Sequence, residues 1–99
     1  MEAVSAKVTS QTPARTMARL CNHFKHRVNV VRDGDHALVE FPNASLRMDA
    51  TEHEIQLHLQ AEDAATIERL EGVVSKHLKQ VAAPEELKVE WTGAHPRAT

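Results

Sequence analysis

The chain contains few of the residues on which several classes of protein depend. Its 99 residues include one cysteine, so an internal disulfide is impossible and a disulfide-stapled secreted domain is excluded. Its net charge is -2 and it has no basic run, which argues against a dedicated nucleic-acid or anionic-membrane binder. No apolar run approaches the roughly 20 residues of a membrane helix. We therefore expect neither nucleic acid nor a membrane as a partner.

Two further absences concern location and cofactors. The first ten residues lack the basic segment followed by an apolar segment that marks a signal peptide, so we expect a soluble, cytoplasmic protein. No P-loop, GxGxxG or GxSxG pattern occurs, which removes the usual nucleotide and nucleophile signals. We expect no cofactor. Seven histidines are the compositional oddity, and hydrophobic residues at 41% suit a globular fold.

The chain is organised around a helix that leads directly into a strand. Thr12 is suited to the N-cap position, and Pro13 follows at the first helical position, where its missing N–H costs nothing. An apolar stripe with helical spacing is formed by Met17, Leu20, Cys21 and Phe24. The stripe predicts an amphipathic helix that ends near His26 and buries this face.

Alternating patterns predict six strands and a second helix. The expected strands are 4–9, 28–32, 36–41, 45–50, 53–60 and 87–92, and the second helix runs from a cap at Asp63 to about Val81. Asp33-Gly34 predicts a tight hairpin turn. In the second helix, the missing side chain of Gly72 would allow a close approach to the sheet. The last strand places Leu87, Val89 and Trp91 on its inward side.

The order β-α-β-β-β-β-α-β predicts an α+β fold: an antiparallel sheet with both helices on one face. The two helix-to-strand segments resemble each other, which suggests a pseudo-two-fold βαβ repeat. A ferredoxin-like split βαβ sheet with an inserted hairpin and a curved antiparallel saddle both remain open. We expect one domain over 1–99, with an ordered core at about 4–92 and a flexible tail at 93–99.

The first helix also carries the candidate binding residues. Arginine binds carboxylate and phosphate in a bidentate manner, and Arg15 and Arg19 lie one turn apart. The candidate site for an anionic ligand or a partner consists of Arg15, Arg19, His23 and His26. A solvated helix face is the simpler interpretation of the same pattern.

A metal site is the competing interpretation of this helix end. Cys21, His23 and His26 are all metal-ligand types. Their directions diverge around the helix, however, and no CxxC or HExxH pattern completes a set. If the two halves are related by a pseudo-two-fold axis, His77 lies far from His23 and cannot supply a third ligand. We therefore predict no metal site.

The polar face of the sheet offers a second surface. Its outward residues are polar except for Val31 and Leu38, which could seat a homodimer. No aromatic residue points outward from a predicted strand, since Phe41 and Trp91 belong to inward sets, so the bases of RNA would find no stacking platform. Three hypotheses remain: a binding or accessory module, a small enzyme with a histidine general base, and a structural homodimer. The sequence favours the first, so we expect a non-enzyme.

Three stretches, TPARTMARLCNHFKHRVNV, FPNASLRMDA and SKHLKQ with EELKVEWT, together resemble a bacterial family of proteins of unknown function, the domain of unknown function 2218 family. The resemblance runs from Val4 to Thr92. Members often have glycine and cysteine where this chain has Asn43, Ala44 and Ser45. The resemblance implies a small accessory protein associated with iron or siderophore handling. The family pattern falls on Arg15, His23, Phe24, His26, His77, Glu90 and Trp91.

Overall fold

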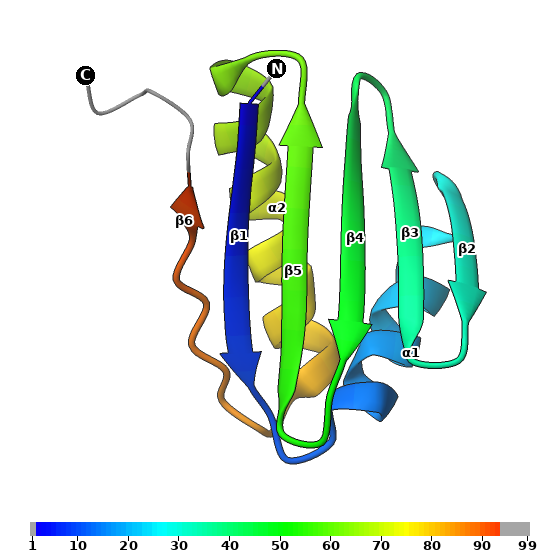
Figure 1. The fold of residues 1–99 in the computed structure, drawn as a ribbon. Helices are drawn as coiled ribbons and strands as arrows, with labels where there is room; N and C mark the ends of the chain where they lie inside the picture. The colour runs from blue at the N-terminus through cyan, green and yellow to red at the C-terminus, as the bar shows by residue number, and fades with distance from the viewer. Residues whose placement is uncertain (1, 94–99) are drawn as a thin grey trace.

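A computed structural model describes residues 2–93 as one antiparallel sheet with two helices on a single face (Figure 1). The expected fold class and element order are both confirmed. The elements are β1 (Glu2–Thr9), α1 (Pro13–Phe24), β2 (Asn29–Asp33), β3 (His36–Phe41), β4 (Ala44–Ala50), β5 (Glu54–Ala61), α2 (Ala64–Ala82) and β6 (Thr92–Gly93).

The strand order across the sheet is β2-β3-β4-β5-β1-β6, with every neighbouring pair antiparallel. Strands β1 and β2 therefore point the same way, and so do β5 and β6. Helix α1 crosses over three strands on its way to β2, whereas α2 crosses only over β1. This is the split βαβ arrangement with an inserted hairpin, the first of the two expected solutions.

The core lies between the sheet and the helices. Helix α2 lies behind β1 and β5, and α1 lies behind the β3–β4 side (Figure 1). Every second residue of β1, β3, β4 and β5 points into this layer, as the period of two in the sequence predicts. The largest fully buried side chains are Met17, Leu20, Leu46, Met48, Ile55, Leu57, Leu59, Ile67, Leu78, Val8, Val39 and Val74.

Two turns and one helix cap have the expected chemistry. Gly34 has a φ of 60°, a conformation that glycine adopts without strain, and it joins β2 to β3. Asn43 also has a positive φ, 62°, directly after Pro42 in the turn between β3 and β4. The side chain of Asp63 accepts a hydrogen bond from the backbone N–H of Thr66 at 2.7 Å, which caps α2 and lowers the pKa of Asp63.

Thr12 is the N-cap residue of α1 and Pro13 opens the helix, as predicted, but the expected capping hydrogen bond is not formed. Thr12 makes no side-chain hydrogen bond to a backbone N–H, and its hydroxyl instead lies 3.4 Å from the hydroxyl of Thr16. The backbone N–H of Thr12 donates to Oγ of Ser10, which turns the chain into the helix. The role proposed for Gly72 is wrong, because a Cβ there would meet nothing within 4 Å.

The last strand is shorter than predicted. Of the described residues after α2, Thr92 and Gly93 alone pair with β1, and the chain from 86 to 91 forms no ladder. The indole N–H of Trp91 donates to Oγ of Ser75 at 2.9 Å, so Trp91 does point inward, but toward α2. At the other end, β1 begins at Glu2 rather than at Val4. Apart from Gly93, the tail expected at 93–99 lies outside the described residues.

Candidate functional site

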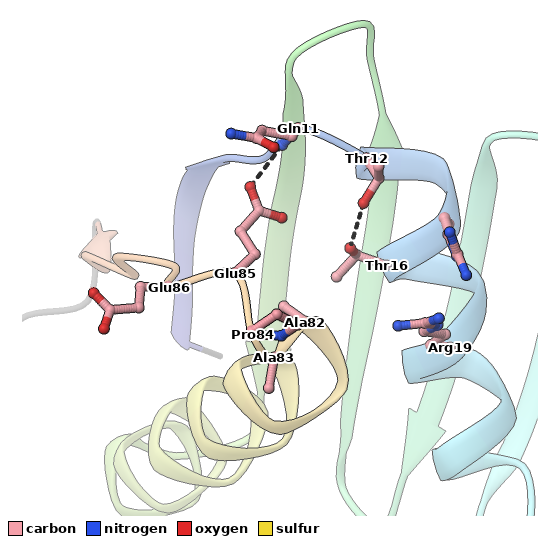
Figure 2. A pocket seen from close by; sticks show the side chains of 10 residues that line it. Gln11, Thr12, Thr16, Arg19, Ala82, Ala83, Pro84, Glu85 and Glu86 are labelled. Atoms are coloured by element: carbon pink, nitrogen blue, oxygen red, sulfur yellow. Dashed lines mark hydrogen bonds between the residues drawn. The ribbon is translucent and has the colours of Figure 1, made fainter.

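The groove between the two helices is the largest hollow found among the described residues. It has a volume of about 840 Å³ and lies where the first turns of α1 face the end of α2 (Figure 2). Three residues of α1 and the two residues before it line one wall, and the end of α2 with the chain that leaves it lines the other. The lining residues are Gln11, Thr12, Arg15, Thr16, Arg19, Ala82, Ala83, Pro84, Glu85 and Glu86.

The groove exists because α2 stops before it reaches the start of α1. Ala83 has extended φ and ψ of -51° and 140°, the conformation that a following proline favours, and Pro84 cannot continue the helix. The chain then turns toward β1. Ala82, Ala83 and Pro84 are small, so they leave space beside Arg19, whose side chain reaches from α1 toward the end of α2 (Figure 2).

Glu85 fixes the outer wall of the groove. Its carboxylate accepts a hydrogen bond from Oγ of Ser10 at 3.0 Å and another from the backbone N–H of Gln11 at 2.7 Å. Both oxygens are therefore engaged by the segment that enters α1, as the dashed line to Gln11 shows for one of them (Figure 2). The negative charge of Glu85 is thus compensated by donors rather than left facing the groove.

The two arginines of the groove differ in their partners. Arg19 donates from Nη1 to the carbonyl oxygen of Val81 at 3.4 Å, at the negative end of α2. Arg15 makes no hydrogen bond or ion pair with any of the residues 2–93. The first turn of α1 also lacks an acidic residue and a side-chain cap. The N-terminal end of α1 therefore keeps both its positive dipole and an unpaired guanidinium at the groove.

His23 does not share this groove. It lies farther along α1, where its ring centroid is 4.4 Å from that of His77 on α2. Phe24 packs edge-on against both imidazoles and against Phe41. The expectation that His23 and His77 lie far apart is wrong. The helices do run antiparallel, as the pairs Arg19–Val81 and His23–His77 show, but α2 is longer and continues past the end of α1.

These surroundings favour the neutral form of His77. Burial lowers its pKa, and the nearby charges of His23, Lys76 and Arg27 lower that pKa further. Its Nδ1 atom is buried and has no hydrogen-bond partner. A cation on His77 would be poorly solvated and surrounded by other basic groups.

His26 lies in the turn after α1, where it is exposed and makes no side-chain hydrogen bond or ion pair with the described residues. Of the four residues predicted for the site, the structure therefore brings only Arg15 and Arg19 together. Cys21 is buried in the core, and burial raises its pKa, so it behaves as an apolar residue. Within 2–93, no three histidine, cysteine or acidic side chains converge as metal ligands.

Sequence reasoning missed a polar cluster on the open sheet face. Nδ1 of His36 lies 2.5 Å from Oδ1 of Asp49, and Nε of Arg47 lies 3.4 Å from Oδ2 of the same carboxylate. The hydrogen bond from His36 lowers the pKa of Asp49, and Arg47 adds to this effect. The turn at Pro42-Asn43 sets the register of β3 against β4 and places His36 opposite Asp49, and this turn was the available signal.

Fold and groove together define a class: a small α+β protein with a split βαβ sheet, whose polar groove opens between its two helices. Residues 5–92 match the family described as "Uncharacterized protein conserved in bacteria (DUF2218)". The match covers most of the chain, and the chain belongs to this family. The resemblance noted in the sequence is thereby confirmed.

One similar solved structure is described as the "NMR structure of PA4090 from Pseudomonas aeruginosa". Its sequence is 24% identical, the alignment covers 93% of this chain and 96% of that one, and the TM-score is 0.78. At this identity the likeness supports the fold alone. No curated protein matches the chain. Among the described helices, none combines the length and the apolar character needed to cross a bilayer.

Proposed function

We propose that this protein is a binding module that takes a small anionic ligand, a carboxylate or a phosphate, in the groove between α1 and α2. Arg15 supplies the main contact, and Arg19 lies one helical turn away on the same wall. The observation that carries the proposal is the unpaired guanidinium of Arg15 beside an uncapped helix start. Guanidinium groups bind carboxylate and phosphate through paired, charge-assisted hydrogen bonds.

Binding fits this site better than catalysis. A histidine general base would need to stand in a cavity beside the reacting groups. Of the hollows found among the described residues, none is lined by two histidines, and the groove between the helices has none in its lining. A small enzyme with a histidine base therefore remains the weaker hypothesis.

Titration calorimetry with pyrophosphate and with citrate tests the proposal. Arg15→Gln is expected to weaken binding about tenfold, the size of one charge-assisted hydrogen bond. Arg69→Gln is the matched control, because Arg69 is an exposed arginine near the start of α2, outside the groove. Equal losses in both variants would mean that only net charge attracts the anion, and would contradict the proposal.

The family resemblance extends the proposal to iron or siderophore handling. Siderophores present anionic oxygen donors, and a ferric complex often retains a negative charge, so such a complex fits the chemistry of Arg15 and Arg19. Ferric citrate and iron-free citrate separate this finer idea from plain anion binding. Tighter binding of the ferric complex, lost in Arg15→Gln, would support it. Equal affinity for both would contradict it.

A homodimer through the open sheet face is a second candidate for the partner. Val31 and Leu38 are the exposed large apolar residues, at 56% and 37% exposure, and they lie opposite each other on β2 and β3. Two apolar side chains account for a small part of a dimer interface, since stable interfaces bury about 1,200–2,000 Å² in total. Light scattering at high concentration tests this idea, with Leu38→Lys expected to give a monomer if the wild type is dimeric.

A further inference from the structure

The open face of the sheet carries a second groove that the first proposal does not use. This face is turned away from both helices (Figure 1). Leu38, Arg47 and His58 lie side by side on β3, β4 and β5 in one row of the ladder. The next row, toward the Asn43 turn, contains Glu40, Ser45 and Gln60.

Two hollows on this face join into one. The first measures about 270 Å³ and reaches Arg47 and His58. The second measures about 400 Å³ and reaches Glu40 and Glu62. Both are lined by Leu38, Ser45 and Gln60, so they form a continuous groove with a shared middle section.

The groove has opposite charges at its two ends. Arg47 supplies a permanent positive charge at one end, and the imidazole of His58 stands beside it. Glu40 and Glu62 supply carboxylates at the other end. Leu38 adds an apolar side chain in the row of Arg47, and Ser45 and Gln60 offer hydrogen-bonding groups in the row of Glu40. A ligand that matches this groove carries an anion at one end and a cation at the other.

Arg47 is held in place for this role by its neighbours. Asp49 contacts the inner nitrogen of the guanidinium, Nε, at 3.4 Å, and His36 binds the other oxygen of Asp49. The terminal nitrogens of Arg47 make no hydrogen bond within the described part of the chain. Both oxygens of Asp49 are thus occupied, and the free edge of the guanidinium can receive a carboxylate.

The length of the groove limits the size of its ligand. Glu40 on β3 is the diagonal neighbour of Arg47 on β4, about 7–8 Å away. Glu62 follows His58 by four positions, which corresponds to about 13 Å of extended chain. An extended tripeptide spans about 10 Å between its charged ends, between these two limits.

We infer that the groove on the open sheet face binds a short zwitterionic peptide. Its C-terminal carboxylate lies on Arg47 and its N-terminal ammonium group lies between Glu40 and Glu62. A central apolar side chain rests on Leu38, beside the exposed Val31. Peptide N–H and C=O groups can bond to Ser45 and Gln60. This inference is independent of the anion site between the helices.

Backbone NMR titration with the tripeptide alanyl-leucyl-alanine tests the inference. Shift changes are expected on β3, β4 and β5 around Leu38, Arg47 and Gln60, and not around Arg15. Acetylating the N-terminus or amidating the C-terminus should each weaken binding about fivefold, as the loss of one exposed ion pair does.

Two variants assign the ends of the peptide. In Arg47→Gln, amidating the C-terminus of the peptide should no longer weaken binding, while acetylating the N-terminus still should. In Glu40→Gln, acetylation should no longer weaken binding, while amidation still should. Arg32→Gln is the control, since Arg32 points to the helix side of β2, opposite the buried Ala37. Glu40 and Arg47 are both exposed, so we expect both variants to fold. Backbone NMR spectra of the variants without peptide, unchanged away from the substituted residue, verify this.

Three outcomes would overturn the inference. The first is shift changes that follow Arg15 and the helix groove, which would assign the peptide to the anion site instead. The second is equal binding of the free, acetylated and amidated peptides. The third is a concentration-dependent dimer that covers Leu38 in the absence of peptide, which would make a second copy of the chain the occupant.

Discussion

The two ends of the seam between α1 and α2 are built from the same side of one helix and behave differently. At one end Arg15 and Arg19 face the open groove, whose opposite wall is formed by the last residue of α2 and the chain that follows it. At the other end, one turn on, His23 stacks on His77 and the space is filled by rings. The opposing chain therefore decides the outcome. Where α2 stops, the polar side chains of α1 line an open groove, and where α2 continues, His23 contacts a ring of α2 although its own side chain remains exposed.

The difference shows that ending one helix early is enough to leave the facing side chains of the other helix available for binding. Arg15, Arg19 and His23 follow one another at intervals of four, so the helix presents them in one line. The early end of α2 at Ala82 removes the facing wall only beside the arginines. Four predictions test this contrast, from the largest expected effect to the smallest.

The core beneath both ends should dominate stability. Leu20 is fully buried between the two ends, and Leu20→Ala is expected to lower the free energy of unfolding by about 2–5 kcal/mol. Arg15→Ala, on the exposed side of the same helix, should change it by less than about 0.5 kcal/mol. Chemical denaturation measures both. Equal midpoints for the two variants would contradict the placement of the helix faces.

At the end of the seam where the groove opens, the free energy of unfolding should depend on Glu85. Removing its carboxylate in Glu85→Ala breaks two hydrogen bonds, to Ser10 and Gln11, and should cost about 1–2 kcal/mol. Glu86→Ala is the matched control, because Glu86 lines the same groove but is exposed and makes no hydrogen bond there. If the two variants unfold at the same denaturant concentration, Glu85 does not hold the groove wall.

At the other end of the seam, where His23 meets His77, the contribution to the free energy of unfolding should depend on pH. In the unfolded chain His77 titrates near 6.5, and in the fold its pKa is lower. The unfolded state then binds more protons in this range, so the free energy of unfolding falls as the pH drops below about 7 and levels off below the folded pKa. His77→Phe should remove this slope, while the exposed His26→Gln should keep it. Thermal unfolding at pH 5 to 8 measures the slopes.

The smallest effect is expected from Arg19. Its hydrogen bond to Val81 is exposed and 3.4 Å long, so Arg19→Ala should change the free energy of unfolding by less than about 0.5 kcal/mol. Anion affinity should fall, however, because the second guanidinium of the groove is lost. A variant with full stability and weaker pyrophosphate binding separates binding from folding. A large loss of stability would assign Arg19 to the structure of the α2 end instead.

Local patterns were sufficient for most of the fold. The stripe of Met17, Leu20 and Phe24 is buried as predicted, the Asp-Gly turn lies where expected, and Asp63 caps α2. Each of these depends on residues close in sequence, where periodicity and turn chemistry decide the structure. The last strand was predicted too long, and the hydrogen bond from Trp91 to Ser75 on α2 joins residues that no local pattern connects.

Two of the four predicted site residues lie together in the groove, and the other two do not, because their positions depend on contacts between distant elements. Arg15 and Arg19 were found because they lie one turn apart on one helix. Their separation from His23 depends on where α2 ends relative to α1, and this is set by packing between elements distant in sequence. The assumed pseudo-symmetry ignored the unequal lengths of the two helices, and so placed His77 at the wrong distance.

Strand β1 precedes the other described strands in the sequence, yet it pairs with strands that come late. Its neighbours are β5 and β6, and its first residue, Glu2, lies opposite Ala61. Strands β2 to β5, by contrast, form a meander whose turns are a few residues long. Closing the long loop to β1 is entropically slow, so we expect folding to begin in the meander and to wait for the arrival of β1. Until then the inner edge of β5 remains unpaired, and a growing chain is most exposed to aggregation at that edge.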